Sequence, residues 1–226
     1  MPLTLDRDRK EQAVGPDANT AFYKYLCQLK DRFPTTKRMT LIHCPTFNFD
    51  SLNIEVARNR SYYAYPPTGL QCLKAALSDF NLEIDILDLN YKLLKKICET
   101  EGEDYLDLTS MLDEYFDSND VSVVGVSAGV IVSNVFGTKR HPFIQTLNYL
   151  ASKGRYLVLT GGVIANNERH RLLNKDLTHF VFDGEAELKL RFFLGQWFDF
   201  TGTPCTPGIH FKYENQVLET REERDV

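Results

Sequence analysis

The sequence predicts a doubly wound α/β fold, in which helices cover both faces of a parallel sheet. Three observations support this prediction. The chain of 226 residues is long enough to bury the core of one large domain. Five short apolar runs lack a helical period, as is typical of buried parallel strands. Amphipathic segments separate these runs, and such an alternation favours a parallel sheet with right-handed crossovers.

The five predicted strands follow one another at intervals that leave room for helices between them. In chain order they are "MTLIHC" (Met39–Cys44), "EIDILDL" (Glu83–Leu89), "VSVVGVS" (Val121–Ser127), "YLVLT" (Tyr156–Thr160) and "HFVF" (His179–Phe182). We therefore expect a five-stranded parallel sheet of the flavodoxin-like (Rossmann-like) type.

Two of the predicted helices have clear boundaries. In "YPPTGLQCLKAAL" the spacing fits a capping box, with Thr68 as the N-cap and Gln71 reaching back to the turn. Pro67 favours an extended residue before it, which keeps this helix from starting early. A second helix is expected to begin at Pro142 and to end at Gly154, the usual positions for these residue types.

The predicted sheet unit has an extension at each end. Residues 1–38 are polar, with an expected helix around Asn19–Phe33 that either caps the sheet or is partly mobile. At the other end, "GIHFKYENQVLET" has two short β-prone runs on either side of Glu214 and Asn215 and is typical of a hairpin. We therefore divide the chain into an N-terminal helical extension (1–38), an α/β domain (39–200) and a C-terminal hairpin and linker (201–226).

Charge and hydrophobicity exclude two classes of partner. With 31 acidic and 26 basic residues the formal net charge is −5, so a broad electrostatic surface for nucleic acid is not expected. No apolar run approaches the about 18 residues that span a bilayer, and the polar start "MPLTLDRDRKEQ" lacks the apolar core of a signal peptide. We expect a cytoplasmic protein with neither nucleic acid nor membrane as a partner.

The cysteines are too far apart for a disulfide framework or a C-x-x-C metal or redox motif. No close group of three offers the thiolates of an iron–sulfur cluster. They are expected to be buried or half-buried reduced thiols. The five are Cys27, Cys44, Cys72, Cys98 and Cys205.

Candidate binding segments follow the predicted strands, because ligands of open α/β sheets bind beyond the carboxyl ends of the strands. The first strand leads into a long loop, Pro45–Pro67, rich in Asn, Arg and Tyr and too long for a simple connector. The third, fourth and fifth strands lead into "SAGVIVSN", "GGVIANN" and "DGEAE". Their small residues let a ligand approach the backbone closely.

Each of these segments also has a purely structural explanation. Gly161 and Gly162 could serve only a tight turn, and Gly184 with Glu185 could only start a helix with an acid at its positive end. Ser127 could be an ordinary hydroxyl at a strand end. Their common position on one edge of the sheet is what favours a binding site.

The order of these motifs resembles a known family. "TLIHCP", the long loop, "YPPTGLQCLKAALSDFNLEIDILDLN", "VVGVSAGVIVSN", "VLTGGVIANN", "FVFDGEAELKLRFFL" and "GIHFKYENQVLET" are similar to the N-terminal cobalamin-binding domain of cobalamin-dependent radical S-adenosylmethionine enzymes. Thr68 stands where that family usually has leucine, and Ala186 stands where it usually has the second glycine of a "GEGE"-like helix start. The resemblance covers about Met39 to Thr220.

The resemblance implies a cobalamin bound base-off and without a histidine ligand. No histidine of this sequence lies in the D-x-H-x-x-G motif that supplies the cobalt ligand in other corrinoid domains. The long loop would cover the lower face of the corrin, with Asn48, Asn53, Arg60, Tyr62 or Tyr63 as neighbours.

The resemblance also implies contacts with the rest of the cofactor. Ser127, Ala128 and Gly129 would lie where the displaced nucleotide tail passes the third strand. The other implied cofactor-binding residues are Gly161, Gly162 and Val163 beside the tail, Gly184 and Glu185 at the corrin edge, and Thr68 at the start of the first helix. No catalytic and no metal-ligating residue is expected in this chain.

The family's chemistry also requires a [4Fe-4S] cluster held by C-x3-C-x2-C in a barrel that follows this domain. This sequence contains neither that motif nor enough residues for the barrel. We therefore expect either the cofactor domain of a longer enzyme or a stand-alone relative, not catalytic by itself. A radical S-adenosylmethionine barrel, in cis or in trans, would bind the cluster and S-adenosylmethionine, and cobalamin would carry a methyl group to an unreactive carbon.

Two other functions remain compatible with the same residues. One is a degenerate domain that binds no corrinoid and serves protein–protein contact. The other is a nucleotide- or flavin-binding module, although "VGVSAG" and "TGGVIA" do not supply G-x-G-x-x-G. A receiver domain is disfavoured because no acidic pair ends the first strand, and a hydrolase because Ser127 lies in V-S-A-G instead of G-x-S-x-G.

Overall fold

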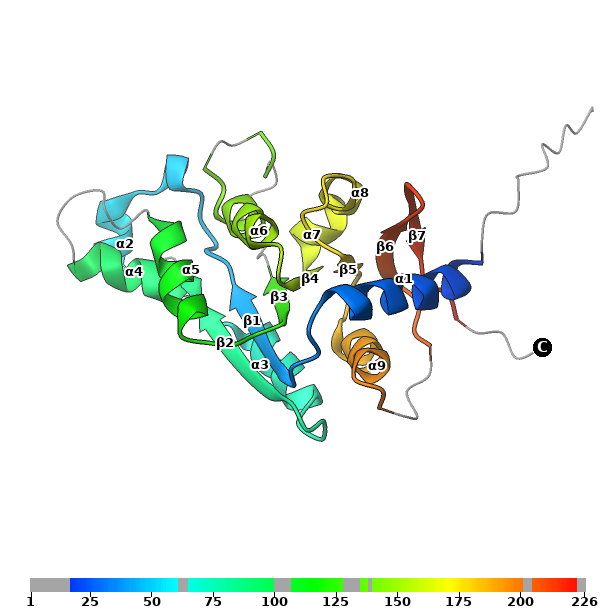
Figure 1. Ribbon diagram of the computed structural model, residues 1–226. Helices are drawn as coiled ribbons and strands as arrows, with labels where there is room; N and C mark the ends of the chain where they lie inside the picture. Colours follow the sequence, from blue (N-terminus) through cyan, green and yellow to red (C-terminus); the bar gives the residue numbers. More distant parts are fainter. Residues whose placement is uncertain are drawn as a thin grey trace, which may run out of the picture.

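The computed structural model describes residues 17–60, 65–99, 107–127, 135–137, 140–200 and 205–222. In these residues a seven-stranded sheet runs in the order β2-β1-β3-β4-β5-β6-β7 (Figure 1). Its strands are β1 (Arg38–His43), β2 (Glu83–Asp88), β3 (Val123–Ser127), β4 (Leu157–Gly161), β5 (Phe180–Phe182), β6 (Ile209–Tyr213) and β7 (Gln216–Glu219).

The first five strands are parallel and confirm the predicted flavodoxin-like order. Their limits differ from the predicted ones by one or two residues. In register, His43 lies opposite both Asp88 and Ser127, and Ser127 lies opposite Gly161. The carboxyl ends of β2, β1, β3 and β4 therefore form one level edge, and the strand order reverses at β1.

The C-terminal hairpin extends the same sheet. β6 pairs antiparallel with β5, and β7 pairs antiparallel with β6. The two residues of the turn, Glu214 and Asn215, both have positive φ, 48° and 62°, as the tight turns of hairpins require. The predicted hairpin is present, and it closes one side of the sheet.

Helices cover both faces of the sheet. The helices of one face, by the core residues they contribute, are α1 (Ala18–Arg32), α3 (Thr68–Ala76) and α9 (Glu187–Trp197). Those of the other face are α2 (Ile54–Arg60), α4 (Leu89–Glu99), α5 (Leu108–Asp117), α6 (Pro142–Lys153), α7 (Val163–Asn167) and α8 (Arg169–Asn174). The predicted N-terminal helix is α1, and α6 begins at Pro142 and is capped by Gly154 at φ 64°, as expected.

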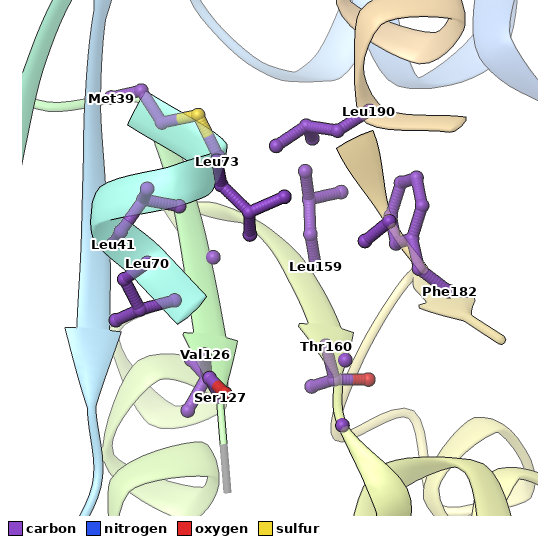
Figure 2. Close-up of a pocket in the computed structure, with 14 residues that line it drawn as sticks. Met39, Leu41, Leu70, Leu73, Val126, Ser127, Leu159, Thr160, Phe182 and Leu190 are labelled. Atoms are coloured by element: carbon purple, nitrogen blue, oxygen red, sulfur yellow. The ribbon is translucent and has the colours of Figure 1, made fainter. Parts of the chain in front are cut away.

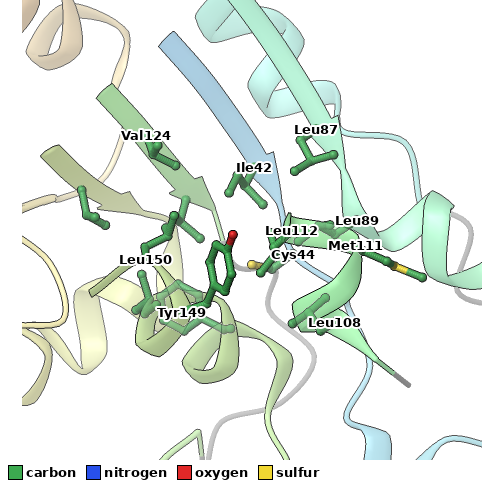
Figure 3. Close-up of a cluster of buried hydrophobic side chains, with 14 of the residues drawn as sticks. Ile42, Cys44, Leu87, Leu89, Leu108, Met111, Leu112, Val124, Tyr149 and Leu150 are labelled. Carbon is green, nitrogen blue, oxygen red and sulfur yellow. The ribbon is translucent and has the colours of Figure 1, made fainter. Parts of the chain in front are cut away.

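Each face of the sheet has its own apolar core. Figure 2 shows part of the first, where Leu41 and Leu159 of the sheet face Leu190 of α9. Figure 3 shows the second, where Ile42 and Val124 of the sheet pack with Leu150 of α6. Neighbouring residues of one strand alternate between the two cores, as they must in a pleated strand.

Two local predictions were wrong. The N-cap of α3 is Pro67, which makes no side-chain capping bond, and Thr68 is the first helical residue. The capping box therefore does not form, because Thr68, whose side chain would accept the capping hydrogen bond, is already inside the helix. The segment Pro45–Pro67 is also not one long loop, since it contains a 3₁₀ turn (Phe49–Ser51) and α2.

Candidate functional site

A narrow apolar slot opens at the carboxyl edge of the parallel strands, between α3 and α9. Its volume is about 70 Å³. In Figure 2, Leu70 and Leu73 of α3 and Leu190 of α9 form its walls above the sheet. The remaining lining residues are Met39, Leu41, Gly125, Val126, Ser127, Leu159, Thr160, Gly161, Gly162, Phe182 and Ala186. A slot of this kind accepts a flat, mostly apolar group.

Gly125 keeps the floor of the slot low. A Cβ atom at this position would lie 2.8 Å from Leu41 Cδ2 and 3.2 Å from Met39 Cε. Any other residue would therefore displace these two side chains, which line the slot. Sequence reasoning missed Gly125, although a glycine inside a β-rich run is a known sign of a close approach.

Gly161 and Gly162 line the slot for different reasons. Gly162 has φ 92° and is the N-cap of α7, so its backbone needs a glycine for the turn itself. Gly161 has no such constraint, and the nearest atom to a Cβ placed on it is Phe182 O at 3.9 Å. The absence of a side chain at Gly161 thus leaves the slot open without being needed for the backbone.

Two hydroxyl groups lie at the strand ends beside the slot. Figure 2 shows Ser127 at the end of β3 and Thr160 near the end of β4. Thr160 Oγ1 donates to Phe180 O at 3.3 Å, so its proton is used within the sheet. The Ser127 hydroxyl has no hydrogen-bond partner among the residues that the structure describes and is half-buried at the slot. It can donate to a ligand.

An imidazole–carboxylate pair lies beside Ser127 on the same edge. His43 Nδ1 is 3.0 Å from Asp88 Oδ1, and Asp88 Oδ1 also accepts from the backbone N–H of Tyr91 at 2.9 Å. The His43 side chain is only 10% exposed. Sequence reasoning missed this pair, yet a signal existed, because His43 and Asp88 end the first two strands, which are neighbours in a 2-1-3 sheet.

A hydrogen bond joins α7, which follows β4, to the segment that follows β5. Asn166 Nδ2 donates to Asp183 Oδ1 at 2.6 Å, and Arg169 Nη1 donates to the Asn166 carbonyl at 2.9 Å. Beyond Asp183 lies His210 of β6, whose Nε2 is 4.0 Å from Asp183 Oδ2, too long for a hydrogen bond. Burial lowers the pKa of His210, so this end of the network is neutral at neutral pH.

The other predicted site residues lie apart from the slot lining. Asn48 is buried, and its side chain caps the 3₁₀ turn by accepting from Asp50 N at 3.1 Å. Thr68 is exposed on the first turn of α3, and Val163 is 51% exposed at the start of α7.

At the strand end of β5, Gly184 has φ 57°, and the Glu185 carbonyl accepts from Lys189 Nζ at 2.9 Å. Of the other residues named for the long loop, Asn53 caps α2 by accepting from Val56 N at 3.0 Å, and Arg60 is the last residue of α2. Tyr62, Tyr63, Ala128 and Gly129 lie outside the described residues.

The exposed large hydrophobic side chains of the described residues share one edge. Tyr65 precedes α3, Tyr91 is in the first turn of α4, Val163 begins α7, and Leu188 is in the first turn of α9. These helices follow β1, β2, β4 and β5, so all four side chains lie towards the carboxyl edge of the sheet.

The cysteines differ in part from what was predicted. Cys44 is fully buried and burial raises its pKa to about 12, so it is an inert thiol. Cys27, Cys72 and Cys98 are exposed, contrary to expectation, because they lie on the outer faces of their helices. Within the described part of the chain no group of three His, Cys, Asp or Glu could hold a metal ion. None of the described helices is long and apolar enough to cross a membrane.

Comparisons with known proteins agree with this fold. No protein-family model matches the sequence, and no curated protein matches it. Among solved structures, the radical S-adenosylmethionine methyltransferase TsrM from Kitasatospora setae, with cobalamin and a [4Fe-4S] cluster bound, is similar with a TM-score of 0.56 and 17% identity. The match covers 83% of this chain and 29% of the TsrM chain.

A second TsrM structure, with tryptophan and a S-adenosylmethionine analogue bound, gives a TM-score of 0.53 and 18% identity over 80% of this chain and 29% of TsrM. The cobalamin-dependent S-adenosylmethionine radical enzyme OxsB, with aqua-cobalamin bound, matches with a TM-score of 0.48 and 13% identity over 83% of this chain and 22% of its own. This chain thus shares its Rossmann-like fold with part of the radical S-adenosylmethionine methyltransferase TsrM, and it spans about 29% of that enzyme's length.

Proposed function

We propose that this chain is a cobalamin-binding domain. The observation that carries the proposal is the apolar slot between α3 and α9, which lies at the point where the strand order reverses. Its residues suit the cofactor's nucleotide tail: Gly125 lets Leu41 and Met39 lie low on the sheet, Gly161 leaves the slot free of a side chain, and leucines form the walls. The fold shared with TsrM, whose structure contains cobalamin, supports the same assignment.

Different residues of the slot would contact different parts of the cofactor. Leu70, Leu73 and Leu190 would contact the flat base of the tail, and the Ser127 hydroxyl would donate to it or to the adjoining sugar. The corrin ring would then lie over the carboxyl edge, where Val163 and Leu188 are exposed. Ala128, Gly129, Gly162, Gly184 and Glu185 complete the proposed contacts with the tail and the corrin edge.

The cofactor would be bound base-off, without a histidine below the cobalt. Asn48, Tyr62, Tyr63 and Thr68 are the proposed neighbours of the corrin on the side of the segment 45–67. When bound, cobalamin supplies a cobalt that accepts and donates a methyl group, while this chain supplies its position and shields the tail from water.

The chain would serve a larger enzyme. We propose that a radical S-adenosylmethionine barrel, in cis or in trans, holds the [4Fe-4S] cluster and S-adenosylmethionine, and that the complete enzyme transfers a methyl group to an unreactive carbon. The name of TsrM as a methyltransferase and the 29% of its length that this chain spans support this arrangement. The chain alone would not be catalytic, and it would act in the cytoplasm.

Cobalamin retention tests the proposal directly. The purified chain is mixed with hydroxocobalamin, free ligand is removed by gel filtration, and the visible spectrum of the protein fraction is recorded. We expect retained cobalamin with a base-off spectrum. No retention at high protein concentration would contradict cobalamin binding and would leave a protein-interaction or nucleotide-binding role.

A matched pair of variants at Gly161 locates the tail. Gly161→Leu should reduce retention about tenfold or more, because its side chain fills the slot without straining the backbone. Gly161→Ala, whose methyl group has no neighbour closer than 3.9 Å, should bind nearly as the natural chain does. Gly162→Leu is a poorer test, since φ 92° at that residue would strain any side chain. Equal retention in both Gly161 variants would exclude the slot as the site of the tail.

A further inference from the structure

We propose a second binding site, for a small molecule with one carboxylate and a short apolar body, at the opposite edge of the sheet. It would be formed where the end of α1 meets the amino ends of β4 and β5. Three donors, on Tyr25, Arg32 and His179, line one cavity there, and none of them has a hydrogen-bond partner among the described residues. The proposal is independent of cobalamin and gives the N-terminal helix a role in ligand binding.

The cavity is large enough for such a molecule. Its volume is about 140 Å³, whereas a single water needs roughly 10–15 Å³ by the same measure. Polar and apolar groups share its surface. Phe33, Leu150 and Leu177 form the apolar wall. A molecule with both a polar and an apolar end therefore suits it better than a simple inorganic ion does.

The hydrogen bonds of His179 fix which of its ring nitrogens carries the proton. The backbone N–H of Val158 donates to His179 Nδ1 at 3.0 Å, so Nδ1 is an acceptor and Nε2 carries the hydrogen. Burial lowers the pKa of His179 to about 4, so the ring stays neutral at neutral pH. The Nε2–H has no acceptor among the described residues, and His179 is part of the cavity lining. It is a fixed donor.

Arg32 is brought beside His179 by an aromatic ring. The Arg32 guanidinium carbon lies 5.0 Å from the centroid of the Phe33 ring, and the same ring meets the His179 ring edge-on at a centroid distance of 5.0 Å. Within the part of the chain that the structure describes, no carboxylate pairs with Arg32. A guanidinium with its fork of donors free is the preferred partner of a carboxylate.

Tyr25 supplies the third donor from the same helix. Its hydroxyl makes no hydrogen bond to any described residue, and burial raises its pKa to about 12, so it keeps its proton. The three donors come from two turns of α1 and from the start of β5. A carboxylate has enough lone pairs to accept from all three.

One acidic side chain lines the cavity together with the three donors. It is Asp176, whose carboxylate is paired with Lys212 at 2.8 Å, whereas Arg32 has no ion-pair partner among the described residues. The α1 and α6 helices both end at this edge, and their carbonyl ends oppose an anion. That effect is weak at an exposed helix end, while a hydrogen bond from Arg32 to a carboxylate is charge-assisted and among the stronger polar contacts.

Titration of the full chain with benzoate tests the proposal. Binding is followed by the ¹⁵N signal of His179 Nε2 in a histidine-labelled sample and by calorimetry. We expect saturable binding in the millimolar range that shifts this signal. Arg32→Gln and Tyr25→Phe should each weaken binding about tenfold. Lys24→Gln, which removes a cation from an exposed position of the same helix, should bind benzoate unchanged.

Three results would overturn the proposal. The first is no saturable binding at millimolar benzoate, the second is equal affinity in Arg32→Gln, Tyr25→Phe and the natural chain, and the third concerns Gly161→Leu. Gly161→Leu keeps the two sites apart, because it should leave benzoate binding unchanged while it blocks the slot at the other edge. A loss of benzoate binding in Gly161→Leu would place benzoate in the slot and contradict the second site.

Discussion

At the scale of single residues, Gly125 determines both the packing of side chains on β3 and the shape of the slot. Its missing side chain lets Leu41 and Met39 lie across β3, and both side chains line the slot. Gly125→Ala should destabilise the protein by about 1–3 kcal/mol, because the added methyl group would lie 2.8 Å from Leu41 Cδ2. Urea denaturation measures the free energy of unfolding.

A second substitution checks the cause of that loss. Leu41→Val removes the Cδ atoms that the new methyl group meets, so the double variant Gly125→Ala/Leu41→Val should be more stable than the sum of the two single effects. Simple additivity of the two changes would show that the contact with Leu41 is not what makes Gly125 necessary.

His141 makes the stability depend on pH. It is 3% exposed, and its Nδ1 accepts from Phe143 N at 3.3 Å, which requires the neutral ring. Burial lowers its pKa to about 4 from an ordinary value of 6.5, so below pH 6.5 only the unfolded chain gains the proton. Stability should therefore fall as the pH falls from 6.5 to 4, by up to about 3 kcal/mol for this group.

His141→Asn separates this contribution from that of His179, whose pKa is also lowered to about 4 by burial. Asparagine keeps a side-chain acceptor at the start of α6 but does not titrate. The variant should lose less stability than the natural chain between pH 7 and pH 5, as measured by urea midpoints. If the stability of the variant falls with pH as steeply as that of the natural chain, the pKa of His141 does not differ between the folded and unfolded states.

The residue scale also shows where sequence reasoning succeeds and fails. Ser127, Gly161 and Gly162 lie together at one edge, as predicted, because parallel strands end there and residues far apart in the chain meet. Thr68 was wrongly predicted to be the N-cap, because a capping motif does not identify the last non-helical residue before a helix. In the structure that residue is Pro67, with φ −77° and ψ 52°. The His43 and Asp88 pair needed the strand order, which no short motif contains.

At the scale of elements, α1 packs on one face of the sheet and contributes to the core on that face. Phe22 is fully buried and its ring lies within 6 Å of the rings of Phe180, Phe192 and Phe211, at 5.8, 5.6 and 5.7 Å. Phe22→Ala should cost about 3–5 kcal/mol, the usual loss when a buried phenylalanine is truncated. Lys24→Ala, exposed on the same helix, should change the free energy of unfolding by less than about 0.5 kcal/mol. Similar stabilities of the two variants would show that α1 is dispensable.

The strands of the parallel sheet were predictable and the place of the hairpin was not. β1, β3 and β4 are covered on both faces, so nearly every residue in them is buried, and their apolar runs stand out in the sequence. β6 pairs antiparallel with β5, and this pairing brings together residues that lie far apart in the chain. A local pattern predicts a hairpin but does not identify the strand that it joins.

At the scale of the whole molecule, the two cores share every central strand. Leu41 and Ile42 of β1 lie in different cores, and so do Val123 and Val124 of β3. Neither core can open without exposing one face of the same strands. The N-terminal helix and the hairpin both contribute to the core on the α9 side, through Phe22 and Phe211. The extensions and the central sheet should therefore unfold together.

The single tryptophan reports on this directly. Trp197 of α9 is fully buried and stacks on Phe193 at a centroid distance of 6.3 Å, inside the core that α1 and β6 complete. Its fluorescence and the far-ultraviolet circular dichroism should change at the same urea concentration, because loss of that core removes one face of the sheet. Phe22→Ala should lower both midpoints together. A change in tryptophan fluorescence at a lower urea concentration than the loss of secondary structure would contradict this prediction. It would mean that the core on the α9 side unfolds alone, while the other core still holds the sheet together.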